Sequence, residues 1–186
     1  ASAAEIFGVA ADKKTLLVLG GSLGARKINQ LIHRHLDEIQ KCDIQLIWQC
    51  GSLYANDYKC LTSVNIHVMP FIDNMLAAYT LADVVVSRAG ALAISEICLM
   101  GKPTLFIPSP NVAENHQEKN ALALADKKAA LLVAERDADD QFWTTLKPLI
   151  MDTSLRAKLG QNIKTFAHPA ATKEILNILT KLLTHE

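Results

Sequence analysis

The stretch Ala82-Asp-Val-Val-Val-Ser-Arg-Ala-Gly-Ala-Leu-Ala-Ile-Ser-Glu-Ile97 decides the fold of this chain. Its apolar run, Val84 to Val86, predicts a short parallel strand that is covered on both faces. The small residues that follow allow another group to approach the backbone closely. The next ten residues, 91–100, are apolar nearly all round, which predicts a buried helix. The stretch therefore indicates a strand, a tight turn and a helix within an α/β sheet.

Glu96 is the acidic residue of this apolar helix. An ionised carboxylate in such surroundings is costly unless it has a partner. The positive end of the helix contributes only a fraction of a kcal/mol to about 1 kcal/mol. A ligand with two hydroxyls, such as a ribose, would satisfy both oxygens. The alternative is a Glu at the helix edge that points to water.

Strand and helix patterns alternate along the rest of the chain. Strands are expected at 15–19, 43–49, 65–69, 84–86, 104–107 and 130–133, and helices at about 25–41, within 52–62, at 73–79, 91–100 and 115–126. From 137 to the end the pattern is helical, with interruptions near 151–152 and at 168–169. This alternation predicts a Rossmann-like, doubly wound parallel α/β sheet of about six strands. With strand order 3-2-1-4-5-6, the glycine turns after Leu19 and Val86 face each other across a ligand crevice.

Local signals mark the helix starts. Ser2 and Glu5 fit a capping box, Gly8 is a possible stop, and Asp73 is expected to cap the helix that ends at Tyr79. Near the end of the chain, an apolar stripe indicates either core packing or a docking face for a missing partner domain. The stripe comprises Ile175, Leu176, Leu179, Leu182 and Leu183.

Composition excludes several classes of protein. The 186 residues suit one domain or slightly more, and no apolar run approaches the ~20 residues that span a bilayer. Basic and acidic residues balance at 19 each, which gives no electrostatic case for a nucleic-acid partner. The cysteines, Cys42, Cys50, Cys60 and Cys98, lack C-x-x-C spacing, so reduced thiols are expected. The start at Ala1 without Met suggests a fragment.

Two loops at strand ends offer backbone groups to a ligand. Gly20-Gly-Ser-Leu-Gly24 joins a strand to a helix and can present N–H groups to a phosphate, with Ser22 as a further donor. It lacks the dinucleotide G-x-G-x-x-G spacing and the P-loop Lys, and the alternative is a tight turn capped by Ser22. In Phe71-Ile-Asp73, the backbone at Ile72 could read the edge of a base, or the side chains could simply anchor the loop.

A polar segment, Asn115-His-Gln-Glu-Lys-Asn120, opens a helix after a proline-rich loop. Amide side chains such as Gln117 and Asn120 suit sugar hydroxyls. His116 could be a base, a ligand or a capping residue. No second His or carboxylate stands at metal-ligand spacing, so the sequence predicts no metal site.

Together these segments resemble the MurG family, the glycosyltransferases that add N-acetylglucosamine to the undecaprenyl-pyrophosphate-linked muramyl-pentapeptide (lipid I) and so form lipid II in bacterial cell-wall synthesis. The matching segments are Gly20 to Ala25, Phe71 to Asp73, Ala82 to Leu92 with Ser95 and Glu96, and Pro108 to Ala121. The last of these is the most specific. The similarity begins near Lys14 and corresponds to the carboxyl-terminal half of a two-domain GT-B enzyme.

The resemblance implies UDP-N-acetylglucosamine as the donor and assigns roles to the matching residues. Gly21, Ser22 and the turn formed by Ala89, Gly90, Ala91 and Leu92 would hold the diphosphate. The Ile72 backbone would read the uracil, and Glu96 would bind the ribose hydroxyls. Gln117, with His116 and Asn120 beside it, would bind the sugar. His116 replaces a Gln that some members of the family carry.

The resemblance also implies what lies outside the chain. Residues 1–13 would be a linker or the remnant of an interdomain segment, and residues 14–186 the donor-binding domain. The lipid I site, the catalytic residues and the contact with the inner face of the bacterial plasma membrane would belong to a missing amino-terminal half. No cofactor, metal or nucleic acid is expected, and the chain alone should bind donor without transferring sugar. Two alternatives stay open: a stand-alone nucleotide-sugar-binding subunit, and a nonenzymatic nucleotide-sugar sensor.

Overall fold

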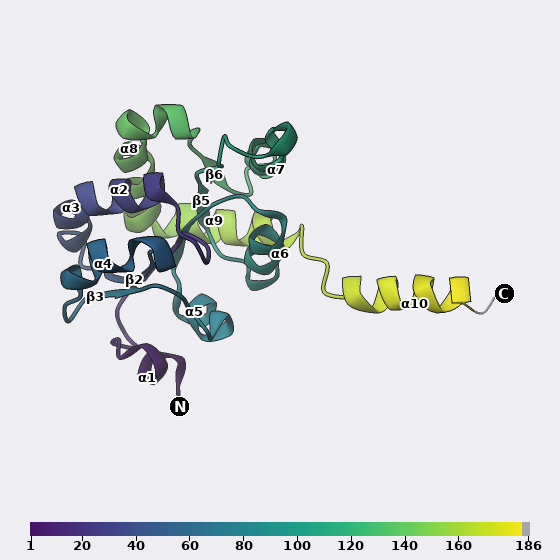
Figure 1. Ribbon diagram of the computed structural model, residues 1–186, viewed down its shortest axis with the longest axis horizontal. Helices are drawn as coiled ribbons and strands as arrows, with labels where there is room; N and C mark the ends of the chain where they lie inside the picture. Colours follow the sequence, from purple (N-terminus) through teal and green to yellow (C-terminus); the bar gives the residue numbers. More distant parts are fainter. Residues whose placement is uncertain (184–186) are drawn as a thin grey trace.

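A six-stranded sheet forms the centre of the computed structural model, which describes residues 1–183 (Figure 1). Its strands are β1 (Thr15–Leu19), β2 (Gln45–Gln49), β3 (Ile66–Met69), β4 (Val84–Ser87), β5 (Thr104–Phe106) and β6 (Leu131–Leu132). They lie in the order β3-β2-β1-β4-β5-β6, and every pair is parallel. At the centre, Leu17 pairs with Ile47 on one side and with Val85 on the other. The doubly wound prediction and its strand order are confirmed.

Ten α-helices connect or flank these strands within residues 1–183. They are α1 (Ala3–Phe7), α2 (Arg26–Arg34), α3 (Leu36–Gln40), α4 (Ala55–Tyr58), α5 (Met75–Leu81), α6 (Ala91–Met100), α7 (His116–Ala125), α8 (Ala138–Met151), α9 (Thr153–Lys164) and α10 (Ala171–Leu183). The single helix expected over 25–41 is divided at His35, which has a ψ of 18° and whose ring stacks on Trp143 of α8. The second strand starts at Gln45 rather than at Asp43, because Asp43 has a φ of 50° that no strand accommodates.

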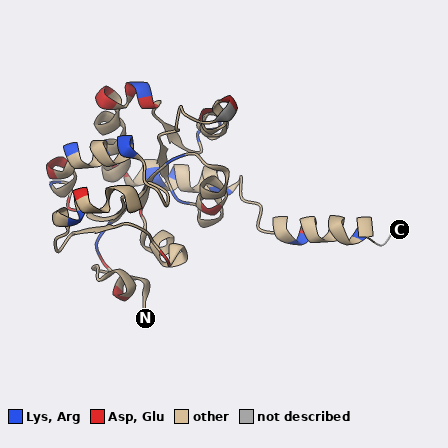
Figure 2. Ribbon diagram, viewed as in Figure 1, with Lys and Arg blue, Asp and Glu red and all other residues tan. Residues whose placement is uncertain are grey.

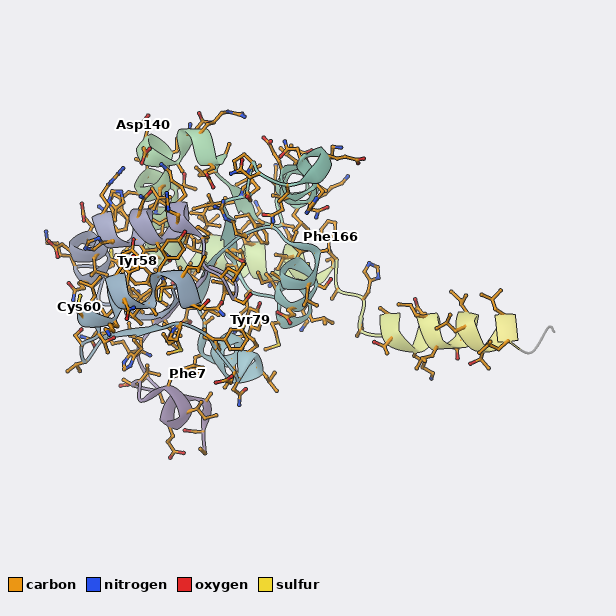
Figure 3. All side chains as sticks on the ribbon, viewed as in Figure 1. Phe7, Tyr58, Cys60, Tyr79, Asp140 and Phe166 are labelled. Atoms are coloured by element: carbon orange, nitrogen blue, oxygen red, sulfur yellow. The ribbon has the colours of Figure 1, made fainter. Side chains whose placement is uncertain are left out.

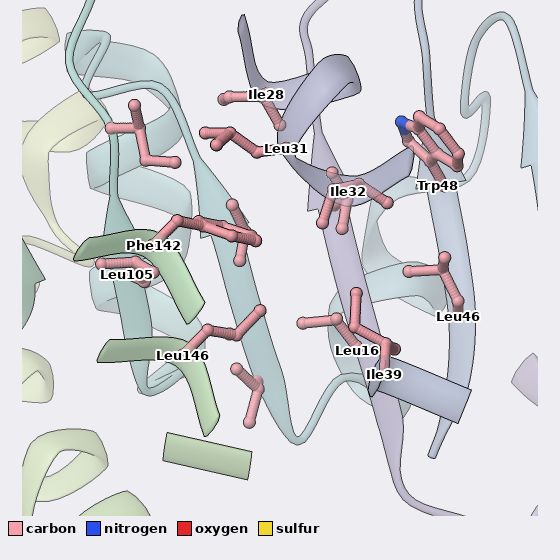
Figure 4. Packing of buried hydrophobic residues seen from close by; sticks show 14 of the residues in the cluster. Leu16, Ile28, Leu31, Ile32, Ile39, Leu46, Trp48, Leu105, Phe142 and Leu146 are labelled. Atoms are coloured by element: carbon pink, nitrogen blue, oxygen red, sulfur yellow. The ribbon is translucent and has the colours of Figure 1, made fainter. Parts of the chain in front are cut away.

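Apolar side chains cover both faces of the sheet. On one face, α2, α3 and α8 pack Ile28, Ile32, Ile39 and Phe142 against the strands (Figure 4). On the other face, α5, α6 and α7 contribute a second cluster that includes Tyr79. Strands that are covered on both faces are apolar at nearly every position, and this is the pattern that identified β1 and β4 in the sequence.

Two expectations about helix structure are wrong. Asn74, not Asp73, caps α5, because its side chain accepts a hydrogen bond from the N–H of Ala77 at 2.9 Å. Helix α6 is only partly buried. Ile97 and Cys98 face the core, whereas Leu92 and Leu99 are exposed and line two separate surface cavities. The capping box of Ser2 and Glu5 and the stop at Gly8 are confirmed.

Helix α10 stands apart from the rest of the chain (Figure 1). Its large apolar side chains, those of Ile175, Leu176, Ile178, Leu179, Leu182 and Leu183, are all at least half exposed. The prediction that this stripe packs in the core is therefore wrong within the described residues, and the prediction that it is a docking face stays untested. The helix is mostly uncharged, whereas charges of both signs are scattered over the rest of the molecule (Figure 2). Within residues 1–183, no helix combines the length and the apolarity that crossing a bilayer requires.

Candidate functional site

A cavity of about 450 Å³ opens at the carboxyl ends of β1, β2 and β4, where the strand order reverses. In a doubly wound sheet this is the place where ligands bind. The cavity brings together seven of the residues predicted from the sequence, namely Gly21, Ser22, Ile72, Gly90, Leu92, Glu96 and Gln117. Three further residues that the sequence did not indicate, Gln49, Tyr79 and Arg88, also line it.

The turn after β1 is held by a close approach of two backbones. Gly24 and Gly51 have φ values of 91° and 87°, and a Cβ on Gly51 would lie only 2.1 Å from the backbone nitrogen of Gly24. The carbonyl of Ser22 also accepts hydrogen bonds from the N–H of Ser52 at 3.0 Å and from its hydroxyl at 3.2 Å. The turn after β1 is therefore fixed by the turn after β2.

Ser22 does not cap the helix that follows it. The N-cap of α2 is Ala25, and α2 has no side-chain cap. Within the described residues, the Ser22 hydroxyl makes no hydrogen bond, and it lies on the wall of the cavity. The capping alternative for Ser22 is therefore wrong, and its hydroxyl can serve a ligand.

The turn after β4 presents unpaired donors at the same cavity. Gly90 is the N-cap of α6 and supplies no side chain, and the first intrahelical bond runs from the N–H of Ile94 to Gly90. The N–H groups of the first turn, residues 91–93, therefore have no acceptor within the helix. Together with the helix dipole they favour an anion. The side chains of Ala89, which is fully buried, and Ala91 do not line the cavity.

The loop after β3 is anchored in the core by Ile72 but not by Phe71, which is exposed. The side chain of Ile72 is 1 % exposed and packs in the core, so it anchors the loop. Its backbone N–H and C=O make no hydrogen bond within residues 1–183, although the residue lines the cavity. Buried backbone groups normally have partners. A donor and an acceptor on one residue are thus available to the edge of a base.

Glu96 has a protein partner, contrary to expectation. The hydroxyl of Tyr79, a residue that Figure 3 labels, donates to Glu96 Oε2 at 3.0 Å, because α5 packs beside α6. The Tyr79 side chain is 2 % exposed. Burial, together with the negative charge of Glu96, raises the pKa of Tyr79 far above its usual value, so the phenol keeps its proton. Glu96 Oε1 makes no hydrogen bond within the described part of the chain and remains for a ligand.

The start of α7 contributes one residue to the cavity and a support behind it. Gln117 lines the cavity, and its Oε1 accepts a hydrogen bond from the N–H of Ser109 at 3.0 Å. The side-chain amide of Asn120 donates to the carbonyl of Ala89 at 3.4 Å and so ties α7 to the turn after β4. His116 is exposed, and neither His116 nor Asn120 lines the cavity.

Arg88 places a positive charge between this cavity and a second one of about 550 Å³. Its Nη1 lies 2.5 Å from Glu135 Oε2 and donates to the carbonyl of Ile107 at 2.9 Å. The sequence contains Arg88 within its fold-deciding stretch but gives no signal for Glu135, which lies 47 positions further along the chain. Among the described residues, no three His, Cys, Asp or Glu side chains are grouped as metal ligands.

Comparisons with known proteins agree with this geometry. A model of the glycosyltransferase family 28 C-terminal domain matches residues 15–175. The UDP-N-acetylglucosamine--N-acetylmuramyl-(pentapeptide) pyrophosphoryl-undecaprenol N-acetylglucosamine transferase of Flavobacterium psychrophilum is 47% identical over 97% of the chain, and its Christiangramia forsetii counterpart is 46% identical over 99%. The chain spans 50% of each of these two relatives.

A solved structure gives the same result. The crystal structure of Acinetobacter baumannii MurG superimposes with a TM-score of 0.78 at 29% identity, covering 97% of this chain and 53% of that one. The resemblance to the MurG family that the motifs indicate is thereby confirmed. The chain belongs to glycosyltransferase family 28, and residues 15–175 carry the C-terminal domain of that family.

Proposed function

We propose that this chain supplies the donor site of an inverting glycosyltransferase that takes N-acetylglucosamine from UDP-N-acetylglucosamine and transfers it to lipid I. One observation carries the proposal. Unpaired N–H groups at the start of α6, the unpaired backbone of Ile72 and one free oxygen of Glu96 all face a single cavity at the switch point of the sheet. These groups complement a diphosphate, a base edge and a ribose, respectively.

Each part of the donor has a proposed partner. Gly21, Ser22 and the backbone of residues 89–92 hold the diphosphate, because they combine N–H donors with a helix N-terminus. The N–H and C=O of Ile72 read one donor–acceptor pair of uracil. Glu96 accepts hydrogen bonds from the ribose hydroxyls through Oε1, while Tyr79 occupies Oε2.

The sugar lies toward α7 in this proposal. Gln117 uses its Oε1 to hold the loop at Ser109, so its NH₂ group remains to donate to a sugar hydroxyl. Asn120 supports the diphosphate turn from behind through Ala89. His116 belongs to the same end of the site, from a position on the surface beside the cavity.

The chemistry that these residues supply is stabilisation of the departing UDP. As the bond between the anomeric carbon and the diphosphate breaks, negative charge grows on the phosphate oxygens, and the free N–H groups of the two turns that line the cavity would stabilise it. The acceptor hydroxyl of lipid I attacks from the opposite face with inversion. The base that takes its proton, the lipid I site and the contact with the inner face of the plasma membrane are assigned to an amino-terminal half, with residues 1–13 as the connection to it.

Calorimetric titration of the 186-residue chain tests the proposal. UDP and UDP-N-acetylglucosamine should bind, and ADP should bind far more weakly. Glu96→Ala should weaken UDP binding by roughly 1–3 kcal/mol, the range for a lost hydrogen bond to a charged group. Glu174→Ala, which removes an exposed acid from α10, is the matched control and should leave UDP binding unchanged. Failure of the unmodified chain to bind UDP would refute the donor site.

Transfer is measured in a second assay. Labelled N-acetylglucosamine should not move to a lipid I analogue in the presence of this chain alone, because positioning of the acceptor contributes several kcal/mol of barrier lowering. Addition of the amino-terminal half of a close relative should restore transfer. A nonenzymatic sensor would bind donor equally well and show no transfer with any such partner.

A further inference from the structure

Two glutamines lie at opposite ends of the same strand, β2. Side chains alternate between the faces of a strand, so Gln45, Ile47 and Gln49 project to one face. Ile47 belongs to the core cluster that also contains Leu19 and Ile72. Both glutamines are nearly fully buried, with exposed fractions of 1 % for Gln45 and 5 % for Gln49. Their surroundings are therefore comparable, and their hydrogen bonding can be compared directly.

The Gln45 amide is fully used by the protein. Its Nε2 donates to the carbonyl of Ala10 at 2.8 Å, to the carbonyl of Lys13 at 3.2 Å and to the hydroxyl of Thr15 at 2.8 Å. Its Oε1 accepts from the N–H of Ala10 at 3.1 Å. Gln45 thus meets the usual requirement that a buried amide is hydrogen-bonded.

The Gln49 amide makes no side-chain hydrogen bond within residues 1–183, although the residue lines the cavity of about 450 Å³. Only its backbone is engaged: its carbonyl accepts from the N–H of Gly20 at 3.1 Å. Among the described residues, the buried polar side-chain atoms without a hydrogen-bond partner belong to His35 and Glu135, so the unbonded amide of Gln49 is accessible from the cavity. An apolar side chain would fill this position equally well, yet the sequence has the amide of Gln49 at the wall of the cavity.

We propose that Gln49 reads the uracil ring of the bound nucleotide, an inference that rests on the proposed donor site. Uracil carries one N–H and two carbonyls on its ring. The N–H and C=O of Ile72 complement one carbonyl and the ring N–H, which leaves the second carbonyl without a protein partner. The Nε2 group of Gln49 donates to that carbonyl.

The place of Gln49 in the sheet assigns it to the base rather than to the phosphates or the ribose. Gln49 pairs in register with Met69 of β3, and the N–H of the next residue, Cys50, donates to the carbonyl of Met69 at 3.0 Å. The chain then reaches Ile72 only three residues after Met69. The groups assigned to the ribose lie instead on α6, and those assigned to the diphosphate lie on the turns after β1 and β4. A neutral amide also suits a ring carbonyl better than a charged diphosphate.

The test uses Gln49→Met, which keeps the length of the side chain and removes its hydrogen-bonding groups. UDP, 2-thio-UDP and 4-thio-UDP are titrated against the unmodified chain and the variant. The variant should bind UDP roughly three- to ten-fold more weakly, as expected for a lost neutral hydrogen bond. The unmodified chain should bind both thio analogues less tightly than UDP, one because of Ile72 and the other because of Gln49. Gln49→Met should keep the first discrimination and bind the second analogue and UDP equally. If Gln49→Met loses the discrimination against one thio analogue, Gln49 contacts the carbonyl that this analogue replaces. The analogue therefore identifies which of the two ring carbonyls is bound.

Folding of the variants is followed by thermal unfolding without ligand. Gln49→Met should unfold at about the same temperature as the unmodified chain, because the Gln49 side-chain amide makes no hydrogen bond to the rest of the described chain. Gln45→Met is the matched control, with a lower unfolding temperature and unchanged preference among the three nucleotides. If Gln49→Met does not fold, Gln49→Asn, which shortens the side chain by one methylene, replaces it. This variant should likewise lose the discrimination between UDP and one thio analogue.

The outcomes separate this inference from the donor site itself. If the unmodified chain fails to bind UDP, both proposals are overturned. If it binds UDP while Gln49→Met keeps both the affinity and the discrimination against the thio analogues, only the role of Gln49 is overturned. If Gln49→Met instead loses the discrimination against 2′,3′-dideoxy-UDP and keeps that against the thio analogues, Gln49 contacts the ribose. That result would also overturn the assignment to the base.

Discussion

Tyr79 is the hydrogen-bond partner of Glu96, the carboxylate proposed to bind the ribose. Its hydroxyl lies 3.0 Å from Glu96 Oε2, its ring is buried, and its pKa is raised by that burial and by the charge of Glu96. A phenol that keeps its proton is a constant donor, so the Glu96 carboxylate is held in one orientation with Oε1 toward the cavity. Tyr79 therefore acts as a positioning residue, through Glu96 and without touching the nucleotide.

Tyr79→Phe tests this positioning role. The variant should bind UDP roughly two- to ten-fold more weakly, the effect of one neutral hydrogen bond. It should bind 2′,3′-dideoxy-UDP as the unmodified chain does, because an oriented carboxylate matters only where hydroxyls are present. Calorimetric titration with both nucleotides measures the difference. Equal weakening for both would mean that the phenol supports the general shape of the cavity and not the ribose contact.

The raised pKa of Tyr79 also predicts how stability depends on pH. In the unfolded chain the phenol ionises near pH 10, whereas in the folded chain it ionises at higher pH. Above about pH 10 the unfolded state therefore binds fewer protons than the folded state, and the free energy of unfolding falls as pH rises. Tyr79→Phe should make this fall shallower between pH 9 and pH 11. Unfolding temperatures across that range provide the measurement, and an identical slope for both proteins would contradict the assignment.

The sequence locates some residues of the site and not others, for a physical reason. Ser22, Ile72, Glu96 and Gln117 lie in segments that resemble a family, and the structure places all four on one cavity. Tyr79 could not be predicted in the same way, because it meets Glu96 across 17 positions and only through the packing of α5 on α6. Gln49 appeared as the last residue of a strand, and strand alternation alone does not say which face ends at a cavity.

Among the secondary structure elements, the turns after β1 and β2 are packed against each other so closely that each needs a glycine. A Cβ on Gly24 would lie 2.3 Å from the carbonyl oxygen of Cys50, and its φ of 91° disfavours any other residue. Gly21 has a φ of 77°, yet a Cβ there would meet nothing within 4 Å. A side chain at Gly21 would therefore introduce backbone strain alone, whereas a side chain at Gly24 would introduce both strain and a steric clash.

Gly24→Ala and Gly21→Ala form a matched pair for the turn. Gly21→Ala should destabilise the chain by about 1 kcal/mol through backbone strain alone. Gly24→Ala should destabilise it by clearly more, because the turn after β2 must also move away. Denaturant unfolding with a common slope for both variants measures the two free energies. Equal destabilisation would show that the two turns separate without cost.

The sequence pattern predicted helix α10 correctly. It did not decide whether the apolar stripe of this helix packs in the core or docks on a partner. An amphipathic stripe at helical spacing has the same appearance whether its partner is the sheet or another protein. The structure leaves the stripe exposed. By contrast, the strands β1 and β4 were predictable because central strands of a parallel sheet must be apolar on both faces.

Removal of residues 171–183 tests the independence of α10. The truncated chain should unfold at the same temperature as the complete one, because the large apolar side chains of α10 bury little surface against the rest of the described chain. UDP binding should also be unchanged. Thermal unfolding and calorimetric titration of both chains measure this, and a loss of several degrees would mean that α10 folds back onto the body in solution.

At the scale of the whole molecule, one sheet separates two apolar layers, and the proposed donor cavity opens at the carboxyl ends of β1, β2 and β4. Cys50 belongs to the layer formed with α2 and α8, and Cys98 to the layer formed with α5, α6 and α7. Both thiols are buried, and burial raises the pKa of each, so neither forms a thiolate readily in the folded chain. Cys60, in contrast, is exposed. The cysteines therefore report on each layer separately.

Pulsed thiol labelling at increasing denaturant uses these reporters to ask whether the two layers unfold as one unit. Cys60 should react without denaturant, and Cys50 and Cys98 should become reactive together at the global transition, because β1 and β4 contribute side chains to both layers and join them. Saturating UDP should shift both transitions equally, since a ligand stabilises whatever unit must fold to bind it. Exposure of Cys98 at a lower denaturant concentration than Cys50 would instead show that the layer beside the cavity opens on its own. The donor site would then be assembled from a part of the chain that is only locally stable, and UDP would protect Cys98 alone.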